Sequence, residues 1–143
     1  MLTVPVNDIS RVMGLKKSVG DVDYLIEAIE HGLPKQALLA VLAYFSQQEA
    51  YTRNELLSKV VSLATFKRRK RLKPDEGEKV ARLARLIAYA RFVWDGDDAA
   101  VREFFTSPHP LLELRRPLDL AFSELGAMKV ERILTNILHG LPA

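Results

Sequence analysis

Residues 52–73 read TRNELLSKVVSLATFKRRKRLK and contain the signals of two short helices joined by a turn. Thr52 and Glu55 have the spacing of a capping box, in which the threonine and glutamate side chains satisfy free N–H groups at the start of a helix. A tight turn should follow this short helix, because Ser62 can cap a second short helix that runs to about Lys70. Two short helices joined by a tight turn form a helix-turn-helix.

The second helix of this pair and the residues after it are strongly basic. Six of the seven residues in Lys67–Lys73 are lysine or arginine. In a DNA-binding helix-turn-helix, the second helix lies in the major groove, where arginine binds guanine or phosphate. The pattern therefore predicts a DNA interface, and we expect Leu63 and Phe66 to face inward and hold this helix to the core. The candidate DNA-contacting residues are Ser62, Ala64, Thr65, Lys67, Arg68, Arg69, Lys70 and Arg71.

Positive charge is concentrated in this part of the chain. The net charge of the whole chain is +3, but residues 67–91 alone carry ten basic and three acidic groups, and the segments on either side are slightly acidic. A localised basic patch is typical of a phosphate-binding surface. Charge runs are more often simply solvated, and RNA or an acidic protein surface are alternative partners. The position of this run on a candidate recognition helix favours DNA.

On the N-terminal side, the apolar pattern predicts two neighbouring helices. Asp21 caps the first, in which apolar residues recur at helical spacing up to Ile29. Pro34 opens the second, which should run to about Ser46. Residues 1–19 show no clear period and are expected to form a loose arm.

On the C-terminal side, prolines and glycines mark out further helices. The longest should begin at Pro74, and the next should follow the turn at Asp95-Gly96-Asp97. Pro117 opens a helix that Gly126 should end, and a last, strongly apolar helix follows up to Gly140. Because no alternating stretch is long enough for a strand, we predict an all-α helical bundle.

The composition excludes several classes of protein. The 143 residues contain no cysteine, which excludes a disulfide framework and thiolate metal ligands and fits a reducing compartment. The N-terminus lacks the pattern of a secretory signal, and no apolar stretch is long enough to span a membrane. We therefore expect a cytoplasmic protein without a membrane partner.

The sequence also disfavours catalysis. His31, His109 and His139 lie far apart and lack the spacing of metal ligands, so no metal site is expected. Acidic residues that lie close together fall at helix ends and turns, no glycine-rich phosphate loop is present, and no serine has the context of a nucleophile. We therefore expect no catalytic residues, no cofactor and no enzymatic activity.

Several motifs occur together in a specific order along the chain. The second short helix has the pattern Ser-x-x-Thr-hydrophobic-x-Arg-Arg, carried by Ser62, Thr65, Phe66, Arg68 and Arg69. A Leu-Pro link precedes it, and a long helix, a Gly-Asp turn, an aromatic helix end, a proline loop and glycine-terminated helices follow. These features are Leu33-Pro34, residues 75–94, Gly96-Asp97, Phe104-Phe105, Pro108, Leu111, Pro117, Gly126 and Gly140. Over roughly residues 30–142, the chain thus resembles the Xre/MbcA/ParS antitoxins.

The resemblance implies an architecture and two partners. After the arm of residues 1–19, it implies an Xre-like helix-turn-helix region, here 20–73, and a C-terminal toxin-binding and dimerisation region, here 74–143. It further implies an antitoxin of a type II toxin–antitoxin system that occludes the active site of a RES-type, NAD-degrading toxin. Such a chain would act as a homodimer within a larger hetero-oligomer and repress its own operon by binding operator DNA.

By position in the family, the toxin contacts fall in the last helix and the tail after it. The candidate residues are Gly126, Lys129, Val130, Ile133, Leu134, Ile137, Leu138, His139, Gly140, Leu141, Pro142 and Ala143. The apolar face of this helix is more often simple core than an interface. The resemblance is compatible with both uses, since one edge can pack inside while the tail faces the toxin.

The chain departs from the family pattern at two positions. Members commonly have glycine in the turn of the helix pair, where this chain has Val60, and tryptophan where it has Phe104. A β-branched residue disfavours a positive φ, so the geometry of the turn is expected to differ. Replacement of one aromatic residue by another says little about function.

On the sequence alone, three functions remain open. The favoured one is an antitoxin that represses transcription and binds a toxin. The second is a stand-alone helix-turn-helix regulator whose C-terminal helices serve dimerisation. The third is a protein-interaction module in which the basic run is incidental.

Overall fold

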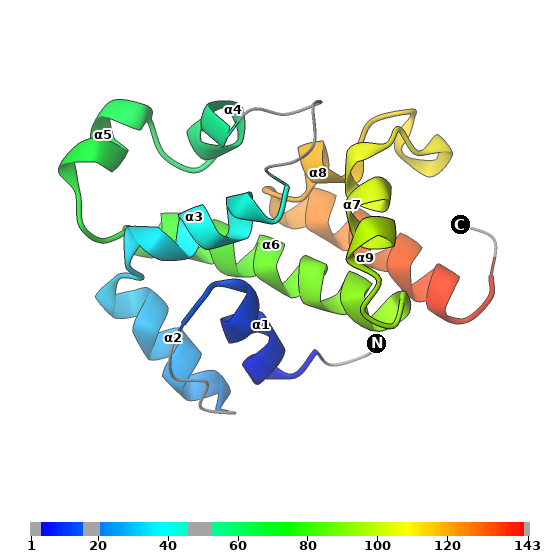
Figure 1. The fold of residues 1–143 in the computed structure, drawn as a ribbon, viewed down its shortest axis with the longest axis horizontal. Coiled ribbons are helices and arrows are strands. Elements are labelled where there is room, and N and C mark those ends of the chain that lie inside the picture. Colours follow the sequence, from blue (N-terminus) through cyan, green and yellow to red (C-terminus); the bar gives the residue numbers. More distant parts are fainter. Residues whose placement is uncertain (1–3, 16–20, 46–52, 142–143) are drawn as a thin grey trace.

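The structure is a computed structural model that describes residues 4–15, 21–45 and 53–141. Within these ranges the chain forms nine α-helices and one 3-10 helix, and pairing of extended backbone is limited to two isolated bridges (Figure 1). The elements are α1 (Val6–Val12), α2 (Val22–His31), α3 (Lys35–Ala43), α4 (Arg53–Ser58), α5 (Leu63–Arg68), α6 (Pro74–Val93), α7 (Asp98–Thr106), η1 (Pro110–Leu112), α8 (Pro117–Leu120) and α9 (Glu124–Leu138). The prediction of an all-α fold is confirmed.

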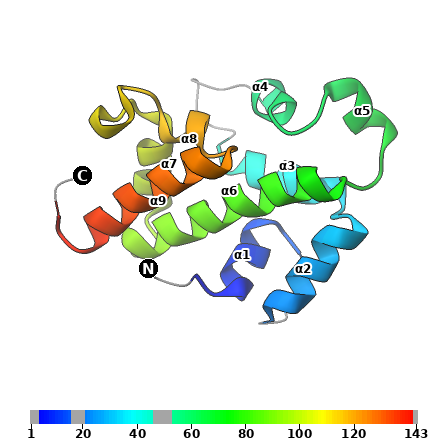
Figure 2. The ribbon, with the colours of Figure 1, turned by 180° about the vertical axis from the view of Figure 1, so that it is seen from behind.

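Helix α6 is the central element, and helices from both ends of the chain pack around it (Figures 1 and 2). Its middle is buried on nearly every side, as shown by Leu83, Leu86, Ile87 and Tyr89. Apolar residues lie on more than one side of this helix, and α1, α2, α3, α7 and α9 all contact it. The core is therefore continuous from the N-terminal to the C-terminal helices.

The expectation of a loose arm at the N-terminus is wrong for the described part of that segment. Residues Val6–Val12 form α1, which packs against α6 and buries Ile9 and, one residue past the helix, Met13. Seven residues are too few to display a helical period in sequence. Only the packing of Ile9 and Met13 into the core shows that this segment is part of the fold.

Side-chain caps begin the helices where the sequence predicts them. The carboxylates of Asp21 and Asp97 and the hydroxyl of Ser62 each accept a hydrogen bond from a backbone N–H in the first turn of α2, α7 and α5. The predicted capping box at Thr52 falls outside the described residues. Helix α3 ends at Ala43, earlier than the expected Ser46.

The region around Gly126 differs from the prediction. Helix α8 is a single turn that ends at Leu120, and Ser123 caps the long α9 by accepting a hydrogen bond from the Gly126 N–H at 3.0 Å. Gly126 therefore lies in the first turn of a helix instead of ending one. Ser123, three residues before Gly126, is the local signal for the start of α9. The sequence analysis overlooked it because a proline followed by a glycine suggested one helix from Pro117 to Gly126.

Among the described residues, none of the helices has the length and apolar character needed to cross a membrane.

Candidate nucleic-acid and toxin interfaces

Helices α4 and α5 form the predicted pair of short helices, and α5 projects at one end of the molecule (Figure 1). Ser62 caps α5: its hydroxyl accepts from the Thr65 N–H at 3.2 Å and donates to the Thr65 hydroxyl at 2.8 Å. Phe66 is buried and holds α5 to the core, as expected. Leu63 is exposed, so the prediction that it faces inward is wrong.

The turn between α4 and α5 accommodates Val60 without strain. Val60 is not among the described non-glycine residues with positive φ, and its side chain is buried. The turn closes through hydrogen bonds from the N–H groups of Val60 and Val61 to the carbonyl of Leu57, both at 3.0 Å. The valine therefore supplies an apolar contact at this turn, where a glycine would supply only backbone freedom.

The basic segment after α5 is fastened to the junction of α2 and α3. The Leu72 N–H donates to the Leu33 carbonyl at 2.8 Å, and the Lys35 N–H donates to the Lys70 carbonyl at 3.2 Å. The Arg71 guanidinium donates to the carbonyl of Gly32 at 2.9 Å. Gly32 has a φ of +101°, and a Cβ there would lie 3.0 Å from the Leu72 carbonyl oxygen, so this close approach favours glycine.

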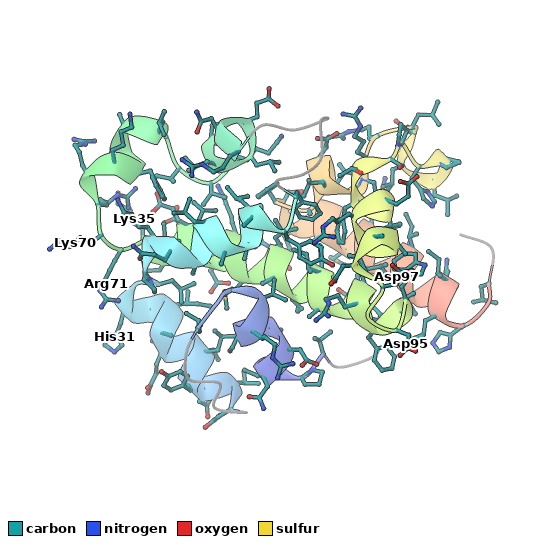
Figure 3. All side chains as sticks on the ribbon, viewed as in Figure 1. His31, Lys35, Lys70, Arg71, Asp95 and Asp97 are labelled. Carbon is teal, nitrogen blue, oxygen red and sulfur yellow. The ribbon has the colours of Figure 1, made fainter. Side chains whose placement is uncertain are left out.

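This fastening places cationic side chains at one end of the molecule. Figure 3 shows Lys35, Lys70, Arg71 and His31 along one end, and the acidic side chains of Asp95 and Asp97 at the other. The Lys35 ammonium itself donates to the Phe66 carbonyl at 3.2 Å and lies over the Phe66 ring, which ties α3 to α5. The cationic surface is thus built on backbone that is already held in place.

The structure separates two kinds of basic residue within 67–91. Four arginines pair with carboxylates, in the ion pairs Arg69–Glu76, Arg82–Glu124, Arg85–Glu131 and Arg91–Asp98. The other six have no carboxylate partner within the described part of the chain, namely Lys67, Arg68, Lys70, Arg71, Lys73 and Lys79. The charge excess counted from sequence therefore overstates the candidate phosphate-binding surface, because five of the six unpaired cations lie on α5 and the segment directly after it and only Lys79 lies on α6.

The remaining DNA candidates fall into two groups. Ala64, Lys67, Arg68 and Lys70 are exposed, and Arg68 donates hydrogen bonds to two atoms of its own helix, the Ala64 carbonyl and the Thr65 hydroxyl. Arg69 differs from the prediction, because both of its terminal nitrogens donate to the Glu76 carboxylate, at 2.7 and 2.6 Å. Its guanidinium therefore points toward the start of α6 and is bound to Glu76.

The inner face of α9 is core, which corrects part of the predicted toxin interface. Val130, Ile133 and Leu134 are buried, so they cannot contact a partner in this fold. Gly126 is also buried against the backbone of Leu120. The sequence pattern showed an apolar face but not which side of the helix the core occupies.

The outward face of α9 exposes the predicted Lys129 together with Leu125, Met128 and Arg132, which the sequence analysis missed. Leu125 is 75% and Met128 53% exposed, and Lys129 and Arg132 are exposed beside them. These residues follow a 3- and 4-residue spacing, so they share one side of the helix. Met128, Arg132 and Thr135 also line a hollow of about 270 Å³ on this side. This spacing is visible in the sequence and could have identified the outward face. The apolar residues of the inner face follow a similar spacing and are more numerous, so they dominated the interpretation.

The end of α9 and the residues directly after it contain the remaining predicted toxin contacts. Ile137 and Leu138 are half-buried at the end of the helix, and His139, Gly140 and Leu141 after it are exposed. The other two predicted contacts, Pro142 and Ala143, lie outside the described residues. What remains of the predicted toxin interface is therefore Lys129 and the segment from 137 to 141.

A polar cluster joins α3 to α6 and α7. The Tyr44 hydroxyl donates to Asp98 Oδ1 at 2.5 Å, and Arg91 Nε donates to the same oxygen at 2.9 Å. Arg102 donates to the Tyr44 carbonyl at 2.7 Å and lies over its ring. The hydrogen bond from Tyr44, and then the hydrogen bond and charge of Arg91, hold the pKa of Asp98 below its usual value against the effect of burial. Burial, and then the bond to Asp98, raise the pKa of Tyr44.

These two surfaces define a helix-turn-helix protein with a separate partner-binding region, and the comparisons agree. Residues 25–85 match the antitoxin Xre-like helix-turn-helix domain, and residues 89–140 match the antitoxin Xre/MbcA/ParS C-terminal toxin-binding domain. The comparison with curated proteins found no match. The chain belongs to the Xre/MbcA/ParS-type antitoxins.

Membership in this family distinguishes the three hypotheses. A toxin-binding domain over 89–140 favours the antitoxin over a stand-alone regulator, and the helix-turn-helix domain disfavours a module with an incidental basic run. The partners that follow are a toxin protein and DNA. Within the described ranges, no group of three or more histidine, aspartate or glutamate side chains could hold a metal ion.

Proposed function

We propose that this antitoxin inhibits a RES-type, NAD-degrading toxin by occluding its active site and represses its own operon through α5. It would do so in the cytoplasm, without catalysis of its own. The observation that supports this proposal is the placement of its two interfaces: α5 and the end of α9 lie at opposite ends of the long axis of the molecule (Figures 1 and 2). One chain can therefore hold DNA and a toxin at the same time.

The DNA half of the proposal depends on the unpaired cations of α5 and the segment after it. Lys67 and Arg68 occupy the last turn of α5, and Lys70 follows on the fastened segment. With α5 in the major groove, Arg68 would contact a base edge, and Lys67 and Lys70 would contact phosphates. Because one short helix offers few base contacts, we propose a homodimer that binds two half-sites about 34 Å apart.

The DNA half can be tested by titrating a duplex from upstream of the coding sequence at several salt concentrations. Arg68→Gln should lower the affinity by about 1–3 kcal/mol, as expected for loss of a guanine contact. Arg115→Gln is the matched control, because it removes one exposed positive charge distant from α5 in the sequence and should have little effect. Equal binding by wild type and Arg68→Gln across the salt series would refute the assignment of α5 as the recognition helix.

The toxin half of the proposal depends on the outward face of α9 and the tail. Leu125 and Met128 provide exposed apolar area, Lys129 and Arg132 provide charge, and the exposed residues 139–141 follow directly after the helix. An exposed apolar patch rimmed by charged residues is typical of a protein interface. Inhibition by occlusion would follow if the tail fills the toxin cleft while the helix face anchors it.

Co-expression with the product of the adjacent gene, followed by a pull-down and an NAD-consumption assay, tests the toxin half. Removal of residues 141–143 should restore NAD consumption while the complex and DNA binding persist. Met128→Glu should weaken the complex itself, and Ser58→Ala on α4 is a surface control. A complex that inhibits equally well without residues 141–143 would show that occlusion depends on other residues.

A further inference from the structure

Glu76 is a buried carboxylate that the proposed DNA and toxin interfaces do not use. Its side chain is 9% exposed, and it lies in the first turn of α6. It accepts three hydrogen bonds: Oε1 from Arg69 at 2.7 Å and from the Lys73 N–H at 2.8 Å, and Oε2 from Arg69 at 2.6 Å. Two parallel bonds from arginine to one carboxylate are among the strongest polar contacts in proteins and also fix the relative orientation of the two groups.

This carboxylate joins two elements that the basic segment separates. Arg69 is the C-terminal cap of α5, and Lys73 is the N-terminal cap of α6. A single side chain thus fixes the end of the recognition helix relative to the start of the central helix. On the far side of the segment, the backbone bonds to Leu33 and Lys35 hold residues 70–72. The segment is therefore held at both sides, and Glu76 supplies the contacts on the side that joins α5 to α6.

We propose that Glu76 is a positioning residue for DNA binding, and that Arg69 acts through it instead of contacting DNA. This inference rests on the proposed function of α5. Arg69 keeps α5 at the angle at which Arg68, Lys67 and Lys70 reach one duplex together. A recognition element held in its bound geometry before binding loses less conformational entropy when the complex forms. Glu76 would thus increase affinity for the operator although its negative charge should repel DNA.

Substitution of Glu76 by glutamine tests this proposal. If only its charge mattered, DNA affinity should rise, whereas loss of a positioning contact should lower it. Removal of an acidic charge near a DNA surface should strengthen binding to any duplex. Glu78→Gln is the matched control, since Glu78 is exposed, lies two residues further along α6 and loses the same charge. We expect Glu76→Gln to weaken operator binding about tenfold relative to Glu78→Gln, a loss within the range seen for coupled residues. Binding to an unrelated duplex should not weaken.

A double-mutant cycle on operator affinity separates the roles of the two partners. Under the proposal, Arg69→Gln and Glu76→Gln each cause the loss, and the double variant is no worse than either. Arg69→Lys, which keeps the charge but cannot form the two-bond fork, should behave like Arg69→Gln. The salt dependence should stay that of wild type in all of these variants, whereas loss of a direct phosphate contact lowers the slope by about one. Circular dichroism and melting curves confirm that each variant is folded at the assay temperature.

Each outcome has a distinct meaning. Operator binding by Glu76→Gln equal to or tighter than that of Glu78→Gln overturns the positioning role. So does an Arg69→Gln loss that persists in the Glu76→Gln background, or one that Arg69→Lys rescues with a normal salt slope, because Arg69 would then contact DNA directly. If the wild-type chain does not bind the duplex at all, the proposed DNA-binding function fails, and this inference fails with it.

Discussion

Gly126 lies in the first turn of α9, which begins a few residues after the single turn of α8. A Cβ at this position would lie 2.1 Å from the carbonyl oxygen of Leu120 and 2.6 Å from the hydroxyl of Ser123. Both distances are far below van der Waals contact, and the Leu120 oxygen belongs to the backbone. Glycine is required here for space and not for an unusual φ.

Gly126→Ala should therefore destabilise the protein by roughly 1–3 kcal/mol, the usual cost of forcing extra volume into a packed site. Gly77→Ala is the contrasting variant, because a Cβ there would make ordinary contacts with Ile29 and Leu33 at 3.4–3.5 Å. Alanine also favours the helix by about 1 kcal/mol, so Gly77→Ala should leave stability unchanged or raise it. Urea denaturation measures both, and equal effects of the two substitutions would contradict this explanation.

Asp98 shows how a contact between distant segments changes one titrating group. The Tyr44 hydroxyl, and then Arg91, hold the pKa of its carboxyl below the usual value. A carboxyl whose pKa is lower in the folded than in the unfolded state stabilises the fold fully above the unfolded pKa, about 3.9. That stabilisation is lost as the pH falls from there through the folded pKa.

Asp98→Asn should therefore cost stability at neutral pH, and its difference from wild type should shrink as the pH falls below about 4. Tyr44→Phe removes the principal cause of the shift and should also make the acid limb less steep. The free energy of unfolding measured in urea between about pH 7 and pH 3 provides the comparison. Parallel pH profiles for wild type and Asp98→Asn would show that this carboxyl does not contribute in the way described.

At the scale of elements, α5 depends on its cap more than longer helices do. It has only six residues, and Ser62 satisfies the Thr65 N–H while its hydroxyl hydrogen points to the Thr65 side chain. Short helices are marginal without tertiary packing, and Phe66 is the buried side chain that α5 contributes. The cap therefore contributes much of the stability of α5, the proposed recognition helix.

Ser62→Ala should lower the stability by about 1 kcal/mol and increase amide hydrogen exchange in α5 more than elsewhere. Ser58→Ala is the matched control, because Ser58 is exposed and its hydroxyl donates only to the Glu55 carbonyl of its own helix. Operator affinity should also fall in Ser62→Ala, since part of the binding energy would be spent on forming α5. An unchanged exchange rate in α5 would mean that packing alone maintains the helix.

Element boundaries could be predicted where a local signal marks them and not elsewhere. Asp21, Ser62 and Asp97 cap helices as predicted, because a cap is a contact within four residues. The start of α9 was missed, since a proline-to-glycine pattern suggested a longer α8. Helix α1 was missed because it is short and is stabilised by contacts with α6, which its own sequence does not contain.

At the scale of the whole molecule, the two matched domains share one core. Helix α6 begins in the helix-turn-helix domain, continues into the toxin-binding domain and contacts α1, α2 and α3 as well as α7 and α9. Arg85 and Tyr89 on α6 bond to Glu131 and Thr135 on α9. Separation of the two domains would expose the buried side chains of α6.

The protein should therefore unfold in a single transition. Trp94, the only tryptophan of the chain, packs on Phe104 of α7 and reports on the C-terminal half, while far-UV circular dichroism reports on all helices. Both signals should give the same urea midpoint. A fragment of residues 1–94, which lacks α7 to α9, should fail to fold cooperatively. Two separate transitions would show that the domains are independent.

The amino-acid sequence is sufficient to predict the helical class, most of the caps, the basic segment and the family pattern. Each of these depends on residues close together along the chain, where helical spacing and local hydrogen bonding act directly. The packing of the helices, in contrast, determines which cations lack a carboxylate partner, which face of α9 is buried and whether α1 belongs to the core. These depend on pairs such as Tyr44 with Asp98 or Arg85 with Glu131, which are distant along the chain. Packing directions bring them together, and the hydrophobic pattern of a single helix does not encode those directions.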